Sequence, residues 1–250
     1  MAIPSSTIAI READTIWHEQ GGWFEARWHF SFDRYRDPEQ LGIGALRVFN
    51  DDRIVAGAEW PMHPHQDIES LTYVVEGSFL HADSLGNNGR LAPGAAQVMT
   101  FSHRGDEHSE KNGSPDEPMR FIQFWILPSV RGLETRVQQR QFTTEERTDR
   151  WLQIMGPAGT DGLDLSQDAR ALVAHLRAGR LEHTFGPGRG GYFYVIDGRV
   201  KVDDEHLRTG DALKITAETD LTITTDLAAE LILIDVPLDF EPVGVWARER

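Results

Sequence analysis

The chain contains no cysteine among its 250 residues. This absence excludes disulfide bonds, thiolate metal ligands and a cysteine nucleophile, and it fits a reducing compartment. The sequence also lacks an apolar run of the roughly 18–20 residues that a membrane-spanning helix needs. No basic segment followed by an apolar stretch stands at the N-terminus, so we predict no signal peptide. We therefore expect a cytoplasmic protein without a membrane partner.

Basic residues are scarce relative to acidic ones. The chain has 25 Lys and Arg against 40 Asp and Glu, which gives a formal net charge of −15. Because nucleic-acid binding needs a basic phosphate-binding face, we expect no direct contact with nucleic acid. The acidic residues are spread along the sequence, as is typical of a solvated surface. The sequence carries no clear marker of oligomerisation, and we expect a monomer.

Helical periodicity is also weak. Many short runs of β-branched and aromatic residues are instead separated by turn residues, which predicts an all-β fold built from sandwiches or barrels. The apolar stretch over residues 165–176 could be read as a helix, but its place in the sequence favours strands. The clearest expected strands cover residues 45–49, 121–127, 221–224 and 230–236, and the first should end at an Asn50-Asp51-Asp52 turn.

The chain repeats itself. Residues 72–77 (TYVVEG) resemble residues 193–198 (FYVIDG), and residues 91–95 (LAPGA) resemble residues 207–211 (LRTGD). In each half a β-prone run ends at an acidic-Gly pair, which is a hairpin signal because Gly accepts the positive φ of such turns.

This repeat divides the chain into two similar units. We predict two consecutive β-barrels with little helix, the first over residues 1–128 and the second over residues 161–250. Residues 129–160 should connect them. The C-terminal tail should pack back on the first barrel.

Two pairs of residues carry the strongest functional signal. His63 and His65 are separated by one residue, as are His108 and Glu110. On a β-strand this spacing puts both members of a pair on the same face. If the two strands lie side by side, three imidazoles and one carboxylate converge. This donor set suits divalent Fe, Mn, Ni, Cu or Zn and leaves a coordination position open for catalysis.

The glutamate that would complete the site has a competitor. Together with Gly57, Gly105 and Asn112, the histidines approach the two sequence motifs of the cupin barrel, in which Glu69 would occupy the general ligand position. We favour Glu110, because His-x-Glu on one strand mirrors His-x-His on the other. Either carboxylate could also accept a proton.

Another departure from the cupin motifs lies at His103, near a position where they have proline. We interpret His103 as a loop residue without a role. Alternatively, His103 or Arg104 shapes the entrance to the site.

The second half lacks equivalent metal ligands. When the two histidines of the first pair are shifted by the repeat offset, they fall on Thr184 and Gly186. The counterparts of the second pair fall near Thr224 and Asp226. His183 is one residue out of step, which on a strand predicts the opposite face. The second barrel should therefore be free of metal and serve a structural role.

Residues 63–77 (HPHQDIESLTYVVEG) resemble the signature of the pirin family of bicupins. The similarity continues through residues 81–87, 108–110 and 123–125, and residues 46–52 also fit. It is dense over about residues 23–128 and looser beyond.

The resemblance implies two barrels with one metal in the first. The ligands of the family carry over onto His63, His65, His108 and Glu110. Fe(II) is the usual metal, although the same ligands also accept Mn, Ni, Cu, Co or Zn.

Bacterial members of the family include quercetin 2,3-dioxygenases, so one hypothesis is a dioxygenase that opens the ring of a flavonol with O2. In that reaction Glu110 would accept the hydroxyl proton. The expected apolar walls for a flat aromatic substrate are Trp60, Met62, Phe79, Phe121 and Trp125.

Other relatives resemble regulators, so the alternative is a metal-dependent binding protein that acts on a partner protein. A third interpretation is a structural bicupin with an inert site.

Overall fold

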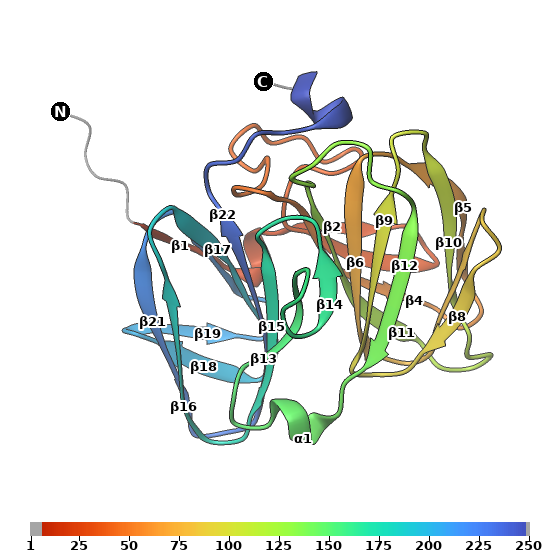
Figure 1. Cartoon of the computed structure of the whole chain (residues 1–250). Helices are drawn as coiled ribbons and strands as arrows, with labels where there is room; N and C mark the ends of the chain where they lie inside the picture. Colours follow the sequence, from red (N-terminus) through yellow and green to blue (C-terminus); the bar gives the residue numbers. More distant parts are fainter. Residues whose placement is uncertain (1–6, 249–250) are drawn as a thin grey trace.

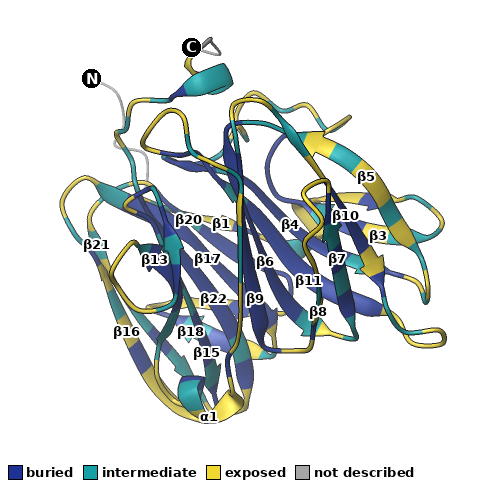
Figure 2. Ribbon diagram, turned by 45° about the vertical axis from the view of Figure 1, so that its right-hand side comes forward, coloured by how far each residue is buried: buried dark blue, intermediate teal, exposed yellow. Residues whose placement is uncertain are grey.

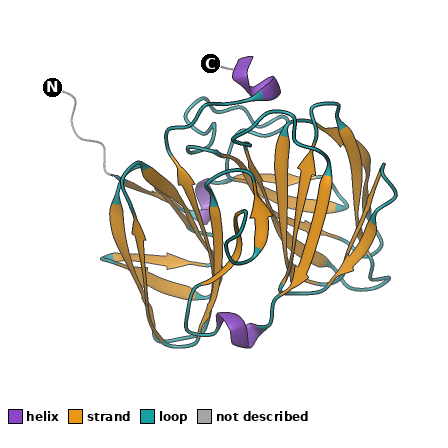
Figure 3. Cartoon of the chain, viewed as in Figure 1, coloured by secondary structure: helices purple, strands orange, loops and turns teal. Residues whose placement is uncertain are grey.

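The computed structural model describes residues 7–248, which form two β-barrels that lie side by side (Figures 1 and 3). Each barrel consists of one seven-stranded and one four-stranded sheet. The predicted all-β fold with two barrels and little helix is therefore confirmed. The described helices are short: η1 (Ala13–Thr15), α1 (Thr144–Arg147) and η2 (Gly244–Arg248).

The first barrel has two sheets. Its large sheet has the order β12 (Arg136–Gln141), β9 (Ala95–Phe101), β6 (Ile68–Glu76), β11 (Met119–Ile126), β4 (Leu46–Ile54), β3 (Phe24–Trp28) and β2 (Trp17–Gln20). Its small sheet has the order β5 (Glu59–His65), β10 (Asp106–Asn112), β7 (Phe79–Asp83) and β8 (Asn88–Leu91).

The second barrel repeats this arrangement. Its large sheet has the order β1 (Ile8–Arg11), β20 (Ala212–Ile215), β17 (Arg189–Asp197), β22 (Ala229–Pro237), β15 (Arg170–Leu176), β13 (Leu152–Pro157) and β14 (Leu163–Leu165). Its small sheet has the order β16 (Gly179–Phe185), β21 (Thr219–Thr225), β18 (Arg199–Val202) and β19 (Glu205–Arg208).

The repeated motif forms the equivalent strands β6 and β17. Both strands end at an acidic-Gly turn, where Gly77 and Gly198 have φ values of 81° and 97°. The positive φ is therefore confirmed, but the expected hairpins are wrong, because β6 and β7 lie in different sheets, as do β17 and β18. Each turn instead carries the chain from the large sheet to the small sheet of its barrel. The stretch over residues 165–176 forms β15 and the end of β14, so it belongs to strands, as expected.

The main hydrophobic core lies between the two large sheets. Alternate residues of each sheet point into it, because successive side chains of a strand face opposite sides. Phe49 and Phe124 from the first barrel pack there with Tyr192 and Tyr194 from the second. The central strands are buried along most of their length, whereas β5 is largely exposed (Figure 2). On their opposite faces, the central strands of each large sheet contribute to a separate core inside their own barrel.

The segment over residues 129–160 joins both barrels. Its strand β12 pairs with β9 of the first barrel, and β13 pairs with β15 of the second. Near the N-terminus, β1 pairs with β20, so this strand extends the sheet of the second barrel. At the other end, the amide of Val245 donates to Asp67 Oδ2 at 3.0 Å, and Trp246 Nε1 donates to the Asp67 carbonyl at 2.9 Å.

The expected turn at Asn50-Asp51-Asp52 is wrong, because β4 continues through these residues to Ile54. Asx residues disfavour strands only when their side chains are not satisfied elsewhere. Asp51 faces the other barrel. Arg120 of the neighbouring strand β11 donates from Nε to Oδ1 at 2.8 Å, and the hydroxyl of Tyr194 from the second barrel donates to Oδ2. Although burial opposes ionisation, Arg120 lowers the pKa of Asp51. Buried ion pairing therefore overrides the local turn preference.

Candidate metal centre

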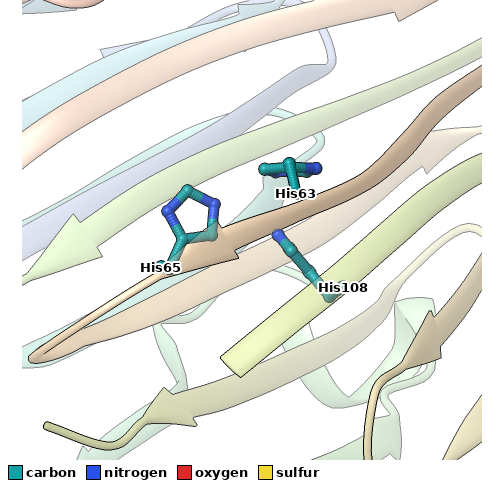
Figure 4. Close-up of side chains that lie close together, drawn as sticks. All are labelled: His63, His65 and His108. Carbon is teal, nitrogen blue, oxygen red and sulfur yellow. The ribbon is translucent and has the colours of Figure 1, made fainter. Parts of the chain in front are cut away.

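Strands β5 and β10 bring the two predicted pairs together. They run antiparallel, with His108 directly opposite His63. The side chains of His63, His65 and His108 converge (Figure 4), and one ring nitrogen of each lies within 4.8 Å of those of the other two. The ring centroids are 4.5 to 5.0 Å apart. Within residues 7–248 this group contains no carboxylate.

His108 provides an independent sign that the group binds a cation. Its side chain is buried, and neither ring nitrogen has a hydrogen-bond partner among the described residues. A buried polar atom without a partner lowers stability unless a ligand satisfies it. Burial, helped by His63 and His65, holds the pKa of His108 well below its usual range. The ring is therefore neutral, which is the form that binds a metal.

The other two histidines also have features that favour metal coordination. Burial, with a smaller effect of His63, lowers the pKa of His65 to about 3. His63 Nδ1 donates to the Pro61 carbonyl at 2.9 Å, which leaves the lone pair of Nε2 free for a metal. The residues present thus fit a divalent first-row metal with imidazole ligands.

Glu110 lies in the same cavity as His63 and His65. Gln123 Nε2 donates a hydrogen bond to Glu110 Oε1. Burial raises the pKa of Glu110 to about 8, although the Gln123 hydrogen bond acts in the opposite direction. Without a cation this carboxyl is therefore mostly protonated at pH 7. A bound divalent cation would favour the charged form.

Glu69, the competing carboxylate, points toward the other barrel. It accepts hydrogen bonds from the Ser166 amide at 2.9 and 3.1 Å and from the Ser166 hydroxyl at 2.9 Å. Its strand neighbours on the same face, Leu71 and Tyr73, belong to the core between the barrels. Glu69 is not among the residues that line the cavity.

The cavity has a volume of about 670 Å³, which suits a small organic ligand. Its walls are mainly aromatic, and a polar group of side chains lies within them. The lining comprises Phe24, Trp28, Phe32, Trp60 and Trp125, the polar Asn50, Asp52, Glu110 and Gln123, and Asp33, Arg34, His63 and His65.

Three of the five expected wall residues do not line this cavity. Phe79 and Phe121 are fully buried in the core of the first barrel, and Met62 is 44% exposed. A β-bulge explains Met62, since the register shifts between His63 and Trp60, which face His108 and Glu110. Trp60 and His63 can therefore both point inward, while the residue before His63 turns outward.

Asn50 and Asp52 are cavity residues that the sequence did not reveal. The local preference of an Asn-Asp-Asp run for turns hides the alternation of its side chains across a strand. Burial, followed by the charge of Glu110, raises the pKa of Asp52 well above its usual range. One indication in the sequence was that both residues belong to residues 46–52, which fit the resemblance to the pirin family.

His103 lies outside the cavity lining, as does Arg104. The His103 side chain is 65% exposed, and Nδ1 lies 2.8 Å from Asp67 Oδ2. The same carboxylate oxygen accepts the Val245 amide. His103 therefore contacts the place where the C-terminal segment meets the first barrel.

His183 corrects one expectation for the second barrel. It lies opposite Leu221 on β21, in the same register as His63 opposite His108. His183 faces inward, not outward, and Nε2 lies 3.0 Å from Asp235 Oδ2. The loop after β16 (186–188) is one residue longer than the loop after β5 (66–67), so the repeat offset changes there. The counterparts of the four predicted ligands are His183, Phe185, Leu221 and Ile223.

Two consecutive barrels, the first with a three-histidine group inside it, define a bicupin. A family model described as Pirin matches residues 10–126, and a model described as Quercetinase C-terminal cupin domain matches residues 153–236. The chain is 36% identical to a quercetin 2,3-dioxygenase of Escherichia coli K12 over 92% of this chain and 99% of that protein. The chain belongs to the pirin family.

Other relatives agree with this assignment. A Pirin-like protein of Caulobacter vibrioides is 38% identical over 86% of this chain and 93% of that protein. The crystal structure of the bacterial pirin YhhW from Escherichia coli in complex with nickel(II) matches with a TM-score of 0.85 and 34% identity, over 94% of this chain and 100% of that chain. Together with the three histidines, these similarities indicate a divalent metal cofactor. Within residues 7–248, no helix is long and apolar enough to span a membrane.

Proposed function

We propose that this protein is a metal-dependent dioxygenase that opens the ring of a flavonol such as quercetin, with O2 as the second substrate. The observation that carries the proposal is the aromatic cavity of about 670 Å³ that reaches His63, His65 and Glu110. Relatives that are named quercetin 2,3-dioxygenase support it.

The proposed ligands are His63, His65, His108 and Glu110. A bound divalent metal, for which Fe(II) is our assignment, would act as a Lewis acid and template for the substrate hydroxyl. The flat faces of Trp60 and Trp125 suit a planar substrate and limit the access of water to it.

Glu110 is the proposed proton acceptor. It becomes a competent base once its carboxyl is ionised, and the hydrogen bond from Gln123 holds one oxygen in place. If the metal is bound through Oε1 as well, the other oxygen would take the hydroxyl proton of the substrate. Burial favours the transfer, because it raises the proton affinity of this carboxylate.

The test is aerobic turnover of quercetin by protein loaded in turn with Fe(II), Mn, Ni, Cu or Co. We expect loss of flavonol absorbance with matching O2 uptake for at least one metal. The chelator-treated protein is the control and should show neither signal. Absence of both signals with every metal would refute the proposal. Metal-dependent capture of a stoichiometric protein partner would then favour the regulatory alternative.

A further inference from the structure

Two buried polar side chains in the cavity have no evident structural task. Asn50 and Asp52 lie two positions apart on β4, so both face the interior of the first barrel. They are only 2% and 4% exposed. Asn50 Oδ1 is buried and has no hydrogen-bond partner among the described residues. Asp51, between them, faces the other way and is fully engaged by Arg120 and Tyr194.

The second barrel provides an internal control for these positions. In the first barrel, Asn50 pairs with Gln123 and Asp52 with Phe121 across β4 and β11. At the equivalent positions of β15 and β22, Leu172 pairs with Leu233 and Ala174 with Leu231. The same strand arrangement therefore forms with hydrocarbon side chains at both β4 positions.

A buried polar group without a partner destabilises a fold, whereas an apolar group of similar shape does not. The fold thus explains neither Asn50 nor Asp52. A ligand that brings hydrogen-bonding groups into the cavity would satisfy both. Asn50 Oδ1 can accept a hydrogen bond from a hydroxyl, and the Asp52 carboxyl can accept one when ionised and donate one when protonated.

We infer that Asn50 and Asp52 form a hydroxyl-recognition pair. The identity of the ligand rests on the proposed function. The pair binds ring hydroxyls of the substrate other than the one that meets the metal. The substrate class is therefore a polyhydroxylated planar aromatic. A singly hydroxylated analogue leaves the pair unsatisfied and binds less tightly, because unpaired buried groups penalise the wrong ligand.

The test compares binding of quercetin and 3-hydroxyflavone, which has a single hydroxyl. The protein is loaded with redox-inactive Zn(II), so that no turnover is needed. Binding is followed through the fluorescence of Trp28, Trp60 and Trp125, which line the cavity. Asn50→Leu and Asp52→Ala introduce the residues that the second barrel carries at these positions. Asp204→Ala, which removes a fully exposed carboxylate of the second barrel, is the matched control.

We expect each cavity variant to weaken quercetin binding about tenfold, as the loss of one buried hydrogen bond predicts, and to leave 3-hydroxyflavone binding within about twofold. The Tm of the ligand-free variants should be unchanged or raised. The control should alter neither affinity.

A lower Tm with equal weakening of both ligands would overturn the inference, since that is the result of a structural role. Unchanged quercetin affinity in both variants would overturn it as well, and so would the failure of the wild type to bind either flavonol. The two proposals can fail separately. If the variants lose quercetin binding selectively but the wild type shows no quercetin turnover with any metal, the dioxygenase proposal is refuted and the recognition pair is supported.

Discussion

The two barrels share one strand order, but the side chains in their interiors differ in polarity. In the first barrel, the small sheet brings His63, His65 and His108 together, and the first two line a cavity with Asn50 and Asp52. In the second, equivalent strands present mainly hydrocarbon groups, which form a continuous core with Phe185, Leu221, Ile223 and Leu233. A barrel of this kind therefore does not determine the chemistry. The residues that face its interior do.

The difference also shows where stability resides. Buried apolar side chains fill the second barrel and the layer between the large sheets. Because the first barrel is attached to this layer, it can tolerate polar groups in its interior. Arg120 and Asp51 tie the two regions together through Tyr194 and the Ile196 carbonyl.

The largest expected effect comes from making the first barrel resemble the second at one position. His108→Leu introduces the residue found at 221 and removes a proposed ligand. We expect loss of bound metal and a decrease in flavonol turnover of more than about 100-fold. Metal analysis and kcat/KM measure both. His183→Leu is the matched control, and an equal loss of metal there would show that the two barrels do not differ as described.

Opening the interior of the second barrel should affect stability alone. Phe185 is fully buried, so Phe185→Ala leaves a cavity. We expect a loss of about 3–5 kcal/mol in the free energy of unfolding, measured with a chemical denaturant. Metal content should stay at the wild-type value. A loss below about 1 kcal/mol would mean that this interior is not the packed core described.

The polar interior of the first barrel should make the metal-free protein sensitive to pH. The folded pKa of Glu110 is about 8, above its ordinary value of 4.5, so the folded state binds more protons than the unfolded state between these values. Stability therefore falls as pH rises through this window, by about 2–3 kcal/mol between pH 5 and pH 7.

Glu110→Gln should remove this part of the pH dependence, while Asp52 continues to contribute in the same direction. The measurement is the free energy of unfolding of chelator-treated protein across pH 5–8. Identical pH dependence in the variant and the wild type would contradict the assignment.

The smallest effect is expected at His103. The His103 side chain that contacts Asp67 is exposed, and without it Asp67 still accepts the hydrogen bond from the Val245 amide. His103→Ala should change the free energy of unfolding by less than about 1 kcal/mol and leave metal content and turnover unchanged. A clear change in kcat would instead support a role at the entrance of the site.

Local sequence patterns predicted much of this architecture. The acidic-Gly turns at Gly77 and Gly198 and the apolar runs of β11 and β22 depend on neighbouring residues only, which was sufficient for the strands. It was not sufficient for their pairing, because the strands on either side of each turn join different sheets. The convergence of three histidines followed from spacing on two strands together with the repeat.

The missed features depend on distant parts of the chain. The face of His183 depends on a loop that is one residue longer, which an offset from another part of the repeat does not reveal. The strand conformation of Asn50 to Asp52 depends on Arg120 and on a residue of the second barrel. Met62 turns outward because of a bulge, which the period of two cannot anticipate.

We expect metal chemistry only in the first barrel, and anomalous scattering from a crystal grown with a divalent first-row metal would locate the ion. We predict one anomalous peak per chain, about 2.0–2.2 Å from nitrogens of His63, His65 and His108 and from an oxygen of Glu110. A peak at His183 and Asp235, or a peak in the first barrel that the three histidines do not contact, would contradict the account.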